Sequence, residues 1–393
     1  MAVTKTFKKT SKMNKIQMAG PSITQHEMNV VADAMSDWYD NPYYYVEKFQ
    51  EEFAKYHNRN YAVMTPNCTT AIHLLLTCLG VKEGDEVIVP ECTWIASAAP
   101  ITYLKAKPVF CDISADHWCL STDSVERNIT EKTKAIIAVE LYGNMPDMEE
   151  LLYLSKRYNI PLIEDSAEAL GTKYFGKQAG SFGMGSVFSF HRTKTITTGE
   201  GGMLLLDDEE LYKKCMIWRD HGRDSALPQH MREPNQKEYF NKYVTYKYMP
   251  FNIQAALGYA QFQRLGELIA KKRWIFKMYK ERLSNIADLQ FNEESDYVYN
   301  GVWATALVFG ESHNLTKDVA MKKLEELGVP SRPFFYPLSS LPAFPDYNEE
   351  EYKNKNPVAY DVSPRGINLS CALNLTEEQI DFICDGIRKI LEK

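Results

Sequence analysis

Lys194 is the residue whose surroundings suggest covalent chemistry most directly. It lies in FSFHRTKTITTGEGGM (188–203), after an apolar run and before a turn rich in threonine and glycine. A lysine in a partly desolvated pocket can lose its proton and act as an amine nucleophile, whereas a single loop lysine is by default solvated. The loop has no GxxxxGK[ST] or GxGxxG pattern, which excludes a nucleotide-triphosphatase cradle. A flexible surface loop and a covalent lysine remain.

An acidic pair follows another apolar run. In PLIEDSAEALG (161–171), Glu164 and Asp165 stand where a buried strand is expected to end. A carboxylate at this position can reach a pocket at the end of a strand. The alternative is that Asp165 only caps the helix that follows.

Two further segments follow predicted strands. TPNCTT (65–70) begins a predicted helix, whose free N–H groups and hydroxyls form an anion site unless the threonines are ordinary caps. Trp94, in ECTWIASAAP, either stacks on a planar ligand or is a core aromatic. An anion-binding helix start, an aromatic stacker, a strand-end aspartate and a later lysine are together what pyridoxal 5′-phosphate requires. The lysine would hold this cofactor covalently, and the aspartate would keep its ring nitrogen protonated.

The composition is that of an ordinary globular protein, with 45% hydrophobic and 25% charged residues and a net charge of −7. This charge argues against a general nucleic-acid surface. No apolar run is long enough to span a bilayer, and residues 1–15 are predicted to be a disordered tail rather than a signal peptide. The eight cysteines show no CxxC pair and the histidines no HExxH spacing, so we expect reduced thiols in the cytoplasm and no metal site.

Short apolar runs alternate with helical patterns through the first two thirds of the chain. The predicted strands are YAVM (61–64), EVIVP (86–90), KPVFCD (107–112), AIIAVEL (135–141), PLIED (161–165), SVFSF (186–190) and GMLLLDD (202–208). The predicted helices between them include residues 69–80 and 147–160. Strands alternating with helices predict an α/β fold whose central sheet is mostly parallel and covered on both faces.

Residues 251–283 predict one long helix, which Asn252 would cap. After it the strands become fewer and the helices shorter. We therefore expect a large domain over residues 16–264 and a smaller C-terminal α/β domain over residues 265–393.

At this point the chain resembles the DegT/DnrJ/EryC1/StrS sugar aminotransferases, a branch of the three-layer fold-type I enzymes that use pyridoxal 5′-phosphate. The motifs follow in the family's order from about residue 16 to 390, with FSFHRTKTITTGEGGM and EDSAEALG carrying most of the likeness. By this resemblance the catalytic residues are Lys194 and Asp165. The residues that it implies for cofactor binding are Cys68, Thr69, Thr70, Trp94, Asp165, Glu168, Ser189, Lys194 and, lent by the neighbouring subunit, Lys247.

The stretch SRPFFYPL resembles the segment that faces the nucleotide-sugar, which implies Arg332, Tyr336 and Glu168 for substrate binding. Arg219 and Arg223 are weaker candidates for the nucleotide channel and are equally compatible with surface ion pairs. The segments TITTGEGGM and AEALG resemble the corresponding segments of the perosamine-synthase-like subgroup. The resemblance thus implies transfer of an amino group, from glutamate as the expected donor, to C4 of a nucleotide-linked 4-keto-6-deoxy sugar for a surface glycan such as O-antigen.

The resemblance also implies a homodimer with shared active sites. Alternatives are a 3-keto-sugar aminotransferase, a sugar dehydratase using the same cofactor, and a regulator that binds the cofactor without turnover. The sequence departs from the family pattern at three places. Cys68 replaces a small residue, Glu140 in VELYG replaces a frequent histidine, and WYDNPYYYVEKF (38–49) is unusually rich in tyrosine.

Overall fold

The computed structural model describes residues 15–36, 38–232, 237, 239 and 241–392; most of the predicted tail, residues 1–14, lies outside the described residues. A seven-stranded sheet forms the centre of the N-terminal part, in the order β1-β9-β8-β5-β4-β2-β3. Its strands are β1 (Tyr61–Thr65), β2 (Glu86–Pro90), β3 (Lys107–Cys111), β4 (Thr133–Val139), β5 (Leu162–Asp165), β8 (Gly185–Ser189) and β9 (Gly202–Leu206). Each predicted strand is present, with ends displaced by no more than two residues, because these runs are buried on both faces.

Only β9 among these strands runs against its neighbours, pairing antiparallel with both β1 and β8. The other pairs are parallel. Since β1 and β8 both oppose β9, the carboxyl ends of β1, β2, β3, β4, β5 and β8 lie at one edge of the sheet. The start of β9 lies at the same edge. The predicted α/β class with a mostly parallel sheet is confirmed.

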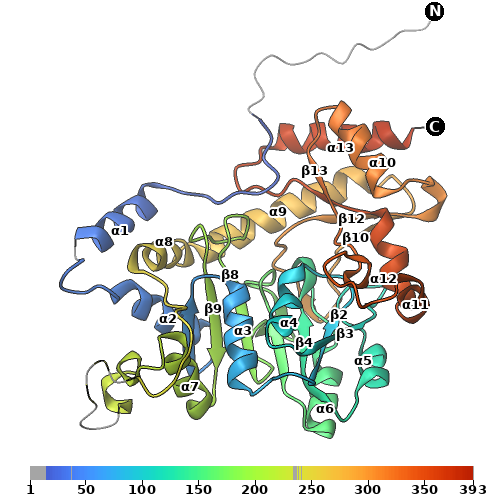
Figure 1. Ribbon diagram of the computed structural model, residues 1–393. Coiled ribbons are helices and arrows are strands. Elements are labelled where there is room, and N and C mark those ends of the chain that lie inside the picture. The colour runs from blue at the N-terminus through green and yellow to red at the C-terminus, as the bar shows by residue number, and fades with distance from the viewer. Residues whose placement is uncertain (1–14, 37, 233–236, 238, 240, 393) are drawn as a thin grey trace, which may run out of the picture.

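Helices cover both faces of this sheet (Figure 1). The helices of the N-terminal part are α1 (Gln25–Ser36), α2 (Tyr44–Tyr56), α3 (Cys68–Cys78), α4 (Ala99–Tyr103), α5 (Thr122–Asn128), α6 (Met148–Tyr158), α7 (Glu209–Arg219) and α8 (Asn252–Phe262), on which α1 packs. Alternate residues of β4 point to opposite sides: Ile137 packs with α3 and α7, whereas Ile136 packs with α6. Three layers with two apolar seams follow from this alternation.

The C-terminal part has an antiparallel sheet in the order β10-β12-β14-β13. Its elements are α9 (Leu265–Leu283), β10 (Leu289–Phe291), β12 (Ala306–Phe309), α10 (Lys317–Glu326), β13 (Ser331–Pro333), α11 (Glu349–Lys355), α12 (Pro357–Val362), β14 (Gly366–Leu369) and α13 (Glu377–Leu391). Helices α9, α10 and α13 share a hydrophobic cluster with this sheet. A small sheet of β11 (Val298–Tyr299), β6 (Lys173–Tyr174) and β7 (Lys177–Gln178) links the two parts. The predicted domain boundary at residue 265 coincides with the start of α9 and stays a prediction.

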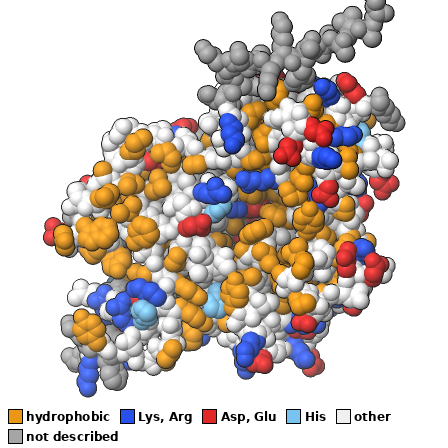
Figure 2. Space-filling view, turned by 45° about the horizontal axis from the view of Figure 1, so that its top comes forward, with side chains coloured by type: hydrophobic (Ala, Val, Ile, Leu, Met, Phe, Trp, Pro, Cys, Tyr) orange, Lys and Arg blue, Asp and Glu red, His pale blue; other side chains and the backbone are white. Residues whose placement is uncertain are grey.

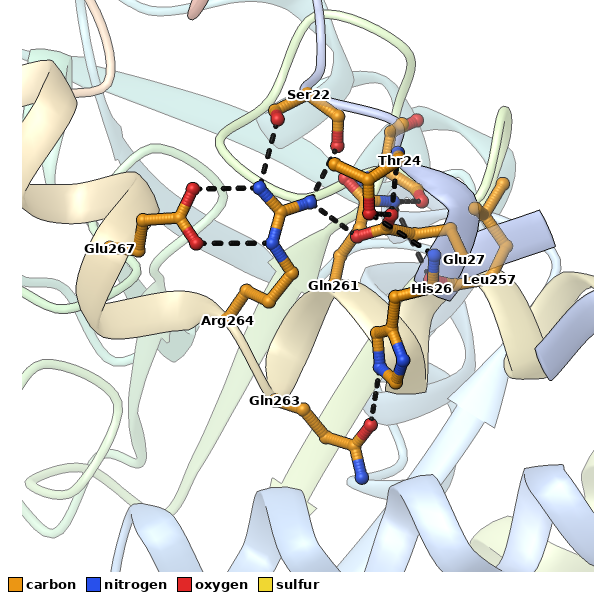
Figure 3. Close-up of polar contacts among 10 residues, drawn as sticks. Ser22, Thr24, His26, Glu27, Leu257, Gln261, Gln263, Arg264 and Glu267 are labelled. Atoms are coloured by element: carbon orange, nitrogen blue, oxygen red, sulfur yellow. Dashed lines mark hydrogen bonds and ion pairs between the residues drawn. The ribbon is translucent and has the colours of Figure 1, made fainter. Parts of the chain in front are cut away.

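The single helix predicted over residues 251–283 is wrong, because the chain breaks between α8 and α9. Arg264 lies at the break and donates hydrogen bonds to Ser22, which precedes α1, and to Glu27, which lies in α1. It also donates to Glu267 in α9 (Figure 3). Asn252 is also not the cap: it is the first helical residue, and its Oδ1 accepts from the backbone N–H of Tyr45 at 2.7 Å. Tertiary contacts therefore decide both features.

Among the described residues, no helix is long and apolar enough to cross a membrane, and no cluster of side chains is suited to a metal ion. All eight cysteines are buried and none is paired in a disulfide.

Candidate functional site

The loop that carries Lys194 joins β8 to β9 and is held on both sides. Thr197 Oγ1 and Thr198 N each donate to the carbonyl of Phe190, which ties the loop to the end of β8. Gln261 of α8 exchanges hydrogen bonds with the backbone of Thr197. The threonines that looked like a flexible run are buried. The loop is therefore a fixed support for Lys194, and the flexible-loop alternative is wrong.

The amine of Lys194 points toward the strand ends. Its Nζ lies 3.1 Å from Oε1 of Glu168, in the turn after β5, and the two side chains are only 13% and 6% exposed. The backbone N–H of Tyr142 donates to the other oxygen of Glu168 at 2.9 Å. On its open side, Nζ lies 3.9 Å from the ring centroid of Trp303. A cation is thus held between a carboxylate and an aromatic face.

Asp165 ends β5 and is buried. Ser97 Oγ donates to its Oδ2 at 2.7 Å, and the N–H of Ala167 to its Oδ1 at 3.2 Å. Burial raises the pKa of Asp165, against these hydrogen bonds and the charge of Lys194. A cationic partner would restore the ionised form, and a protonated pyridine nitrogen is such a partner. The position thus suits the predicted cofactor.

The start of α3 lies at the same edge of the sheet. Asn67 caps the helix by accepting from the N–H of Thr70 at 2.9 Å, and the hydroxyl of Thr70 donates to the carbonyl of Asn67 at 2.7 Å. The first N–H groups of a helix have no partner within the helix, so those of Cys68 and Thr69 suit an anion. Burial raises the pKa of the Cys68 thiol well above its usual value. Cys68 thus stays neutral, within reach of the charges of Asp165 and Lys194.

Gly202 allows β9 to approach this helix start. A Cβ at this residue would lie 2.5 Å from the carbonyl carbon of Asn67 and 2.6 Å from the nitrogen of Cys68. Ser189 pairs with Gly202 across the sheet and is half-buried at the end of β8. Only glycine permits this close approach, which places the start of β9 and Ser189 against the start of α3; we call this group of backbone and serine the cradle.

Trp94 follows β2 at the same edge and is 61% exposed, so it is not a core aromatic. Its ring centroid lies 6.2 Å from that of Phe335. A bridge between Cys92 and Pro337 brings the SRPFFYPL stretch alongside. Trp94 is thus largely exposed and lies beside Phe335, the neighbour in sequence of Tyr336.

Arg332 and Tyr336 are both exposed in this stretch. Burial lowers the pKa of His191, and the positive charges of Lys194, Arg192 and Arg332 lower it further. The negative charge of Glu200 acts in the opposite direction. Arg332 therefore lies within electrostatic reach of the lysine loop. The Tyr336 ring rests on the amine of Lys317, at 3.4 Å from Nζ to the ring centroid.

Three other basic candidates already bind groups within this chain. Arg219 is buried and donates to the Met64 carbonyl, so it is neither a channel residue nor a surface partner. Arg223 and Lys247 both bind the carboxylate of Asp220, with Lys247 Nζ at 2.7 Å from Oδ1. Lys247 is half exposed, and its predicted role toward a neighbouring subunit stays a prediction.

Glu140 follows β4 on the face of the sheet opposite to the cofactor side. Its side chain is fully buried beside Glu164, and burial followed by the charge of Glu164 raises its pKa well above the ordinary value. Glu164 accepts from three backbone N–H groups and lies 3.6 Å from Arg59. The raised pKa of Glu140 favours its neutral form.

Sequence reasoning missed Trp303, Tyr142 and Ser97. Trp303 and Tyr142 carried no spacing signal, because each comes from a loop of irregular backbone. Ser97 lies in the segment ECTWIASAAP, three residues after Trp94, and only the fold brings it to Asp165.

Comparison with known proteins agrees with this arrangement. The model of the DegT/DnrJ/EryC1/StrS aminotransferase family matches residues 21–388. GDP-perosamine synthase of Escherichia coli O157:H7 is 38% identical over 96% of this chain and 99% of its own. GDP-perosamine synthase of Vibrio cholerae is 35% identical over 94% and 97%. Spr1654 of Streptococcus pneumoniae, assigned as a sugar aminotransferase and solved in its PMP form, has a TM-score of 0.86 at 28% identity, covering 96% of this chain and 99% of that one.

Proposed function

Because the chain belongs to the DegT/DnrJ/EryC1/StrS aminotransferase family, we propose that it moves an amino group from glutamate to a nucleotide-linked 4-keto-6-deoxy sugar. The product is a 4-amino-4,6-dideoxy sugar for a surface glycan. The likeness to two GDP-perosamine synthases supports C4 as the position and GDP as the nucleotide. The observation that carries the proposal is the meeting of Lys194, Asp165 and the start of α3 at one edge of the sheet.

The cofactor is pyridoxal 5′-phosphate, which when bound supplies an electron sink for the carbanion formed at the amino donor. The residues present fit it. Lys194 would attach it, Asp165 would keep its ring nitrogen protonated and Trp94 would flank its ring. The phosphate would take the N–H groups that begin α3, together with Ser189.

Lys194 also carries the protons. When free, its Nζ would remove the proton from the α-carbon of the amino donor as general base and would then give a proton back as general acid, which completes the transfer of the amino group. Glu168, 3.1 Å away, keeps the amine beside the strand ends during both steps. The amino donor leaves as a 2-oxo acid before the keto sugar enters, which makes the cycle ping-pong.

The nucleotide diphosphate is anionic, and Arg332 is the basic residue proposed to receive it. Arg332 is exposed and shares its surroundings with His191 and Arg192. Tyr336 would pack against the sugar or base. The eight buried, unpaired cysteines suit the reducing cytoplasm that the sequence predicts.

We further propose a homodimer whose active sites are shared. Hydrophobic side chains gather on the left of Figure 2, the side where Figure 1 shows α1 and α8. The large apolar residues exposed in and after α1 are Met28, Met35, Trp38, Tyr39, Tyr43 and Tyr44. A patch of this kind marks an interface, and a second copy is the occupant that the family membership favours.

Subunit mixing tests the sharing. If Lys247 serves the partner's site, Lys194→Ala and Lys247→Ala chains are each nearly inactive. Refolded together, they regain about one quarter of wild-type activity, since random pairing restores one site in half of the dimers. No recovery on mixing would contradict shared sites.

Product analysis tests the reaction itself. The full chain with pyridoxal 5′-phosphate, glutamate and GDP-4-keto-6-deoxymannose should yield 2-oxoglutarate and a GDP-4-amino sugar in equal amounts. An amino group on C3 by nuclear magnetic resonance would indicate a 3-aminotransferase. Loss of a hydroxyl with ammonia release would indicate a dehydratase, and no turnover with any keto sugar a regulator.

A further inference from the structure

Trp303 makes two separate contacts with the catalytic loop, although it comes from the C-terminal part of the chain, between β11 and β12. The face of its indole ring lies 3.9 Å from the amine of Lys194. Its Nε1–H donates to the carbonyl of Thr193 at 2.9 Å. One side chain therefore holds both the amine and the backbone next to it.

Trp303 is in turn fixed by a stack of aromatic rings. Its ring is nearly parallel to that of Tyr142, with centroids 6.1 Å apart and planes inclined by 2°. Tyr142 stacks on Phe335 in the same way, at 5.5 Å and 4°. The backbone of Tyr142 also donates to Glu168, the other partner of the amine. Tyr142 thus supports both groups that contact Lys194.

The backbone on each side of this stack is strained. Val302, directly before Trp303, has φ of 54°, and Tyr142 has φ of 52°. A β-branched residue in the left-handed region is a genuine outlier. The N–H of Val302 donates to Oδ1 of Asn300 at 2.6 Å, which holds this conformation. Strain of this kind persists where the surroundings impose it and gathers at functional sites.

We propose that Trp303 is a positioning residue for Lys194, which with Glu168 aims the free amine at the position of the cofactor aldehyde. This inference rests on the proposed function, since it assigns Trp303 a role in the same covalent chemistry. A lysine side chain has several rotatable bonds and would otherwise sample many orientations. The indole face restricts these orientations without forming a bond that must be broken.

The rate of covalent capture measures this role. The unprotonated amine adds to the aldehyde carbon of pyridoxal 5′-phosphate, a C=N bond forms, and the aldehyde oxygen leaves as water. Stopped-flow absorbance follows this condensation after cofactor is mixed with cofactor-free full-length chain. Pyridoxamine 5′-phosphate binds without condensing, so its affinity reports the cofactor pocket alone.

Trp303→Leu should capture the aldehyde about 10- to 30-fold more slowly than wild type, the range expected from the side-chain entropy that an unrestrained lysine must lose before it reacts. Its affinity for pyridoxamine 5′-phosphate should change less than about twofold. Trp303→Phe keeps an aromatic face and should recover most of the rate. This variant keeps the test valid if Trp303→Leu folds poorly.

Trp274 provides the matched control. It is half-buried on α9, and the amine of Lys271 lies 3.7 Å from its ring centroid, far from the lysine loop in sequence. Trp274→Leu should leave capture unchanged. Capture by Trp303→Leu at the wild-type rate, or slowed only in step with pyridoxamine 5′-phosphate affinity, would overturn the proposal, and so would capture by Trp303→Phe as slow as capture by Trp303→Leu. A wild-type chain that captures the aldehyde but ignores glutamate would contradict the aminotransferase function and leave this comparison valid.

Discussion

Lys194 and Glu168 form an ion pair that is largely buried, with Nζ 3.1 Å from Oε1, at the edge of the sheet where the parallel strands end and β9 begins. The carboxylate is itself held by the N–H of Tyr142. A buried pair of this kind is costly to break, because either partner alone would be an uncompensated charge. The arrangement therefore fixes the amine in one place before any cofactor arrives.

Replacing Glu168 by Gln should lower turnover by about 10- to 100-fold, because the amine loses the charge that holds it during proton transfer. Binding of pyridoxamine 5′-phosphate should weaken much less. Glu200→Gln is the matched control, since Glu200 lies on the same loop but is exposed. Turnover of Glu168→Gln within twofold of Glu200→Gln would contradict a role for the ion pair.

Replacing Gly202 by Ala should weaken cofactor affinity by at least about 10-fold. The added methyl group would overlap the backbone of Asn67 and Cys68 and push β9 away from the helix start. Equilibrium dialysis with pyridoxamine 5′-phosphate measures the loss. Gly266→Ala, on α9 with open space around it, should leave affinity unchanged and add slight stability. Equal affinities in the two variants would rule out the cradle.

Glu27 should stabilise the corner of α1, α8 and α9 rather than the site. Its burial alone would raise its pKa, but hydrogen bonds from Thr24 and Arg264 hold the pKa at about 2 (Figure 3). This lowered pKa gives stability that is present above the usual value of 4.5 and lost as the pH falls from there toward 2. Glu27→Gln should cost about 3 kcal/mol of unfolding free energy at pH 7, leaving cofactor affinity intact.

Urea unfolding measures that cost, and Glu267→Gln serves as its control. Glu267 binds the same guanidinium of Arg264 from an exposed position, so its loss should cost about 0–1 kcal/mol. If the two variants lost the same unfolding free energy, the buried Glu27 would contribute no more stability than the exposed Glu267.

Glu140 should be replaceable by Gln without loss of stability. Because its folded-state pKa is raised, the folded state binds this proton more tightly than the unfolded state does. The wild type should therefore lose stability relative to Glu140→Gln as the pH rises above 4.5, by about 1.4 kcal/mol per pH unit until the buried carboxyl ionises. Unfolding free energies at pH 6 and pH 8 test this, and parallel values for the two proteins would show that Glu140 is already ionised.

The sequence was sufficient where a residue's position in the fold depends on its own segment. The apolar runs predicted the strands, and Lys194, Asp165 and the start of α3 follow from strand ends that parallel topology brings together. The sequence was insufficient where a contact with a distant segment determines the local structure. The periodicity of residues 251–283 continues through Arg264, and only its bonds to Ser22 and Glu27 show why the helix breaks there.

Trp303 and Arg219 illustrate the same limit. A lone tryptophan beside a strained valine has no pattern that points to a lysine in the other half of the chain. Arg219, at the end of a charged helix, has the sequence context of a surface residue. It is nevertheless buried, and its guanidinium donates a hydrogen bond to the carbonyl of Met64 in β1, a partner that only the folded sheet provides.

The most direct test of a covalent, glutamate-reactive Lys194 is the visible absorbance of the full chain with pyridoxal 5′-phosphate, before and after glutamate, beside Lys194→Ala. We predict a yellow lysine-bound band in the wild type that glutamate bleaches to the pyridoxamine form and that a 4-keto nucleotide sugar restores. Lys194→Ala should show neither the band nor the cycle. A wild-type chain that stays colourless, or that behaves like the variant, would contradict the account.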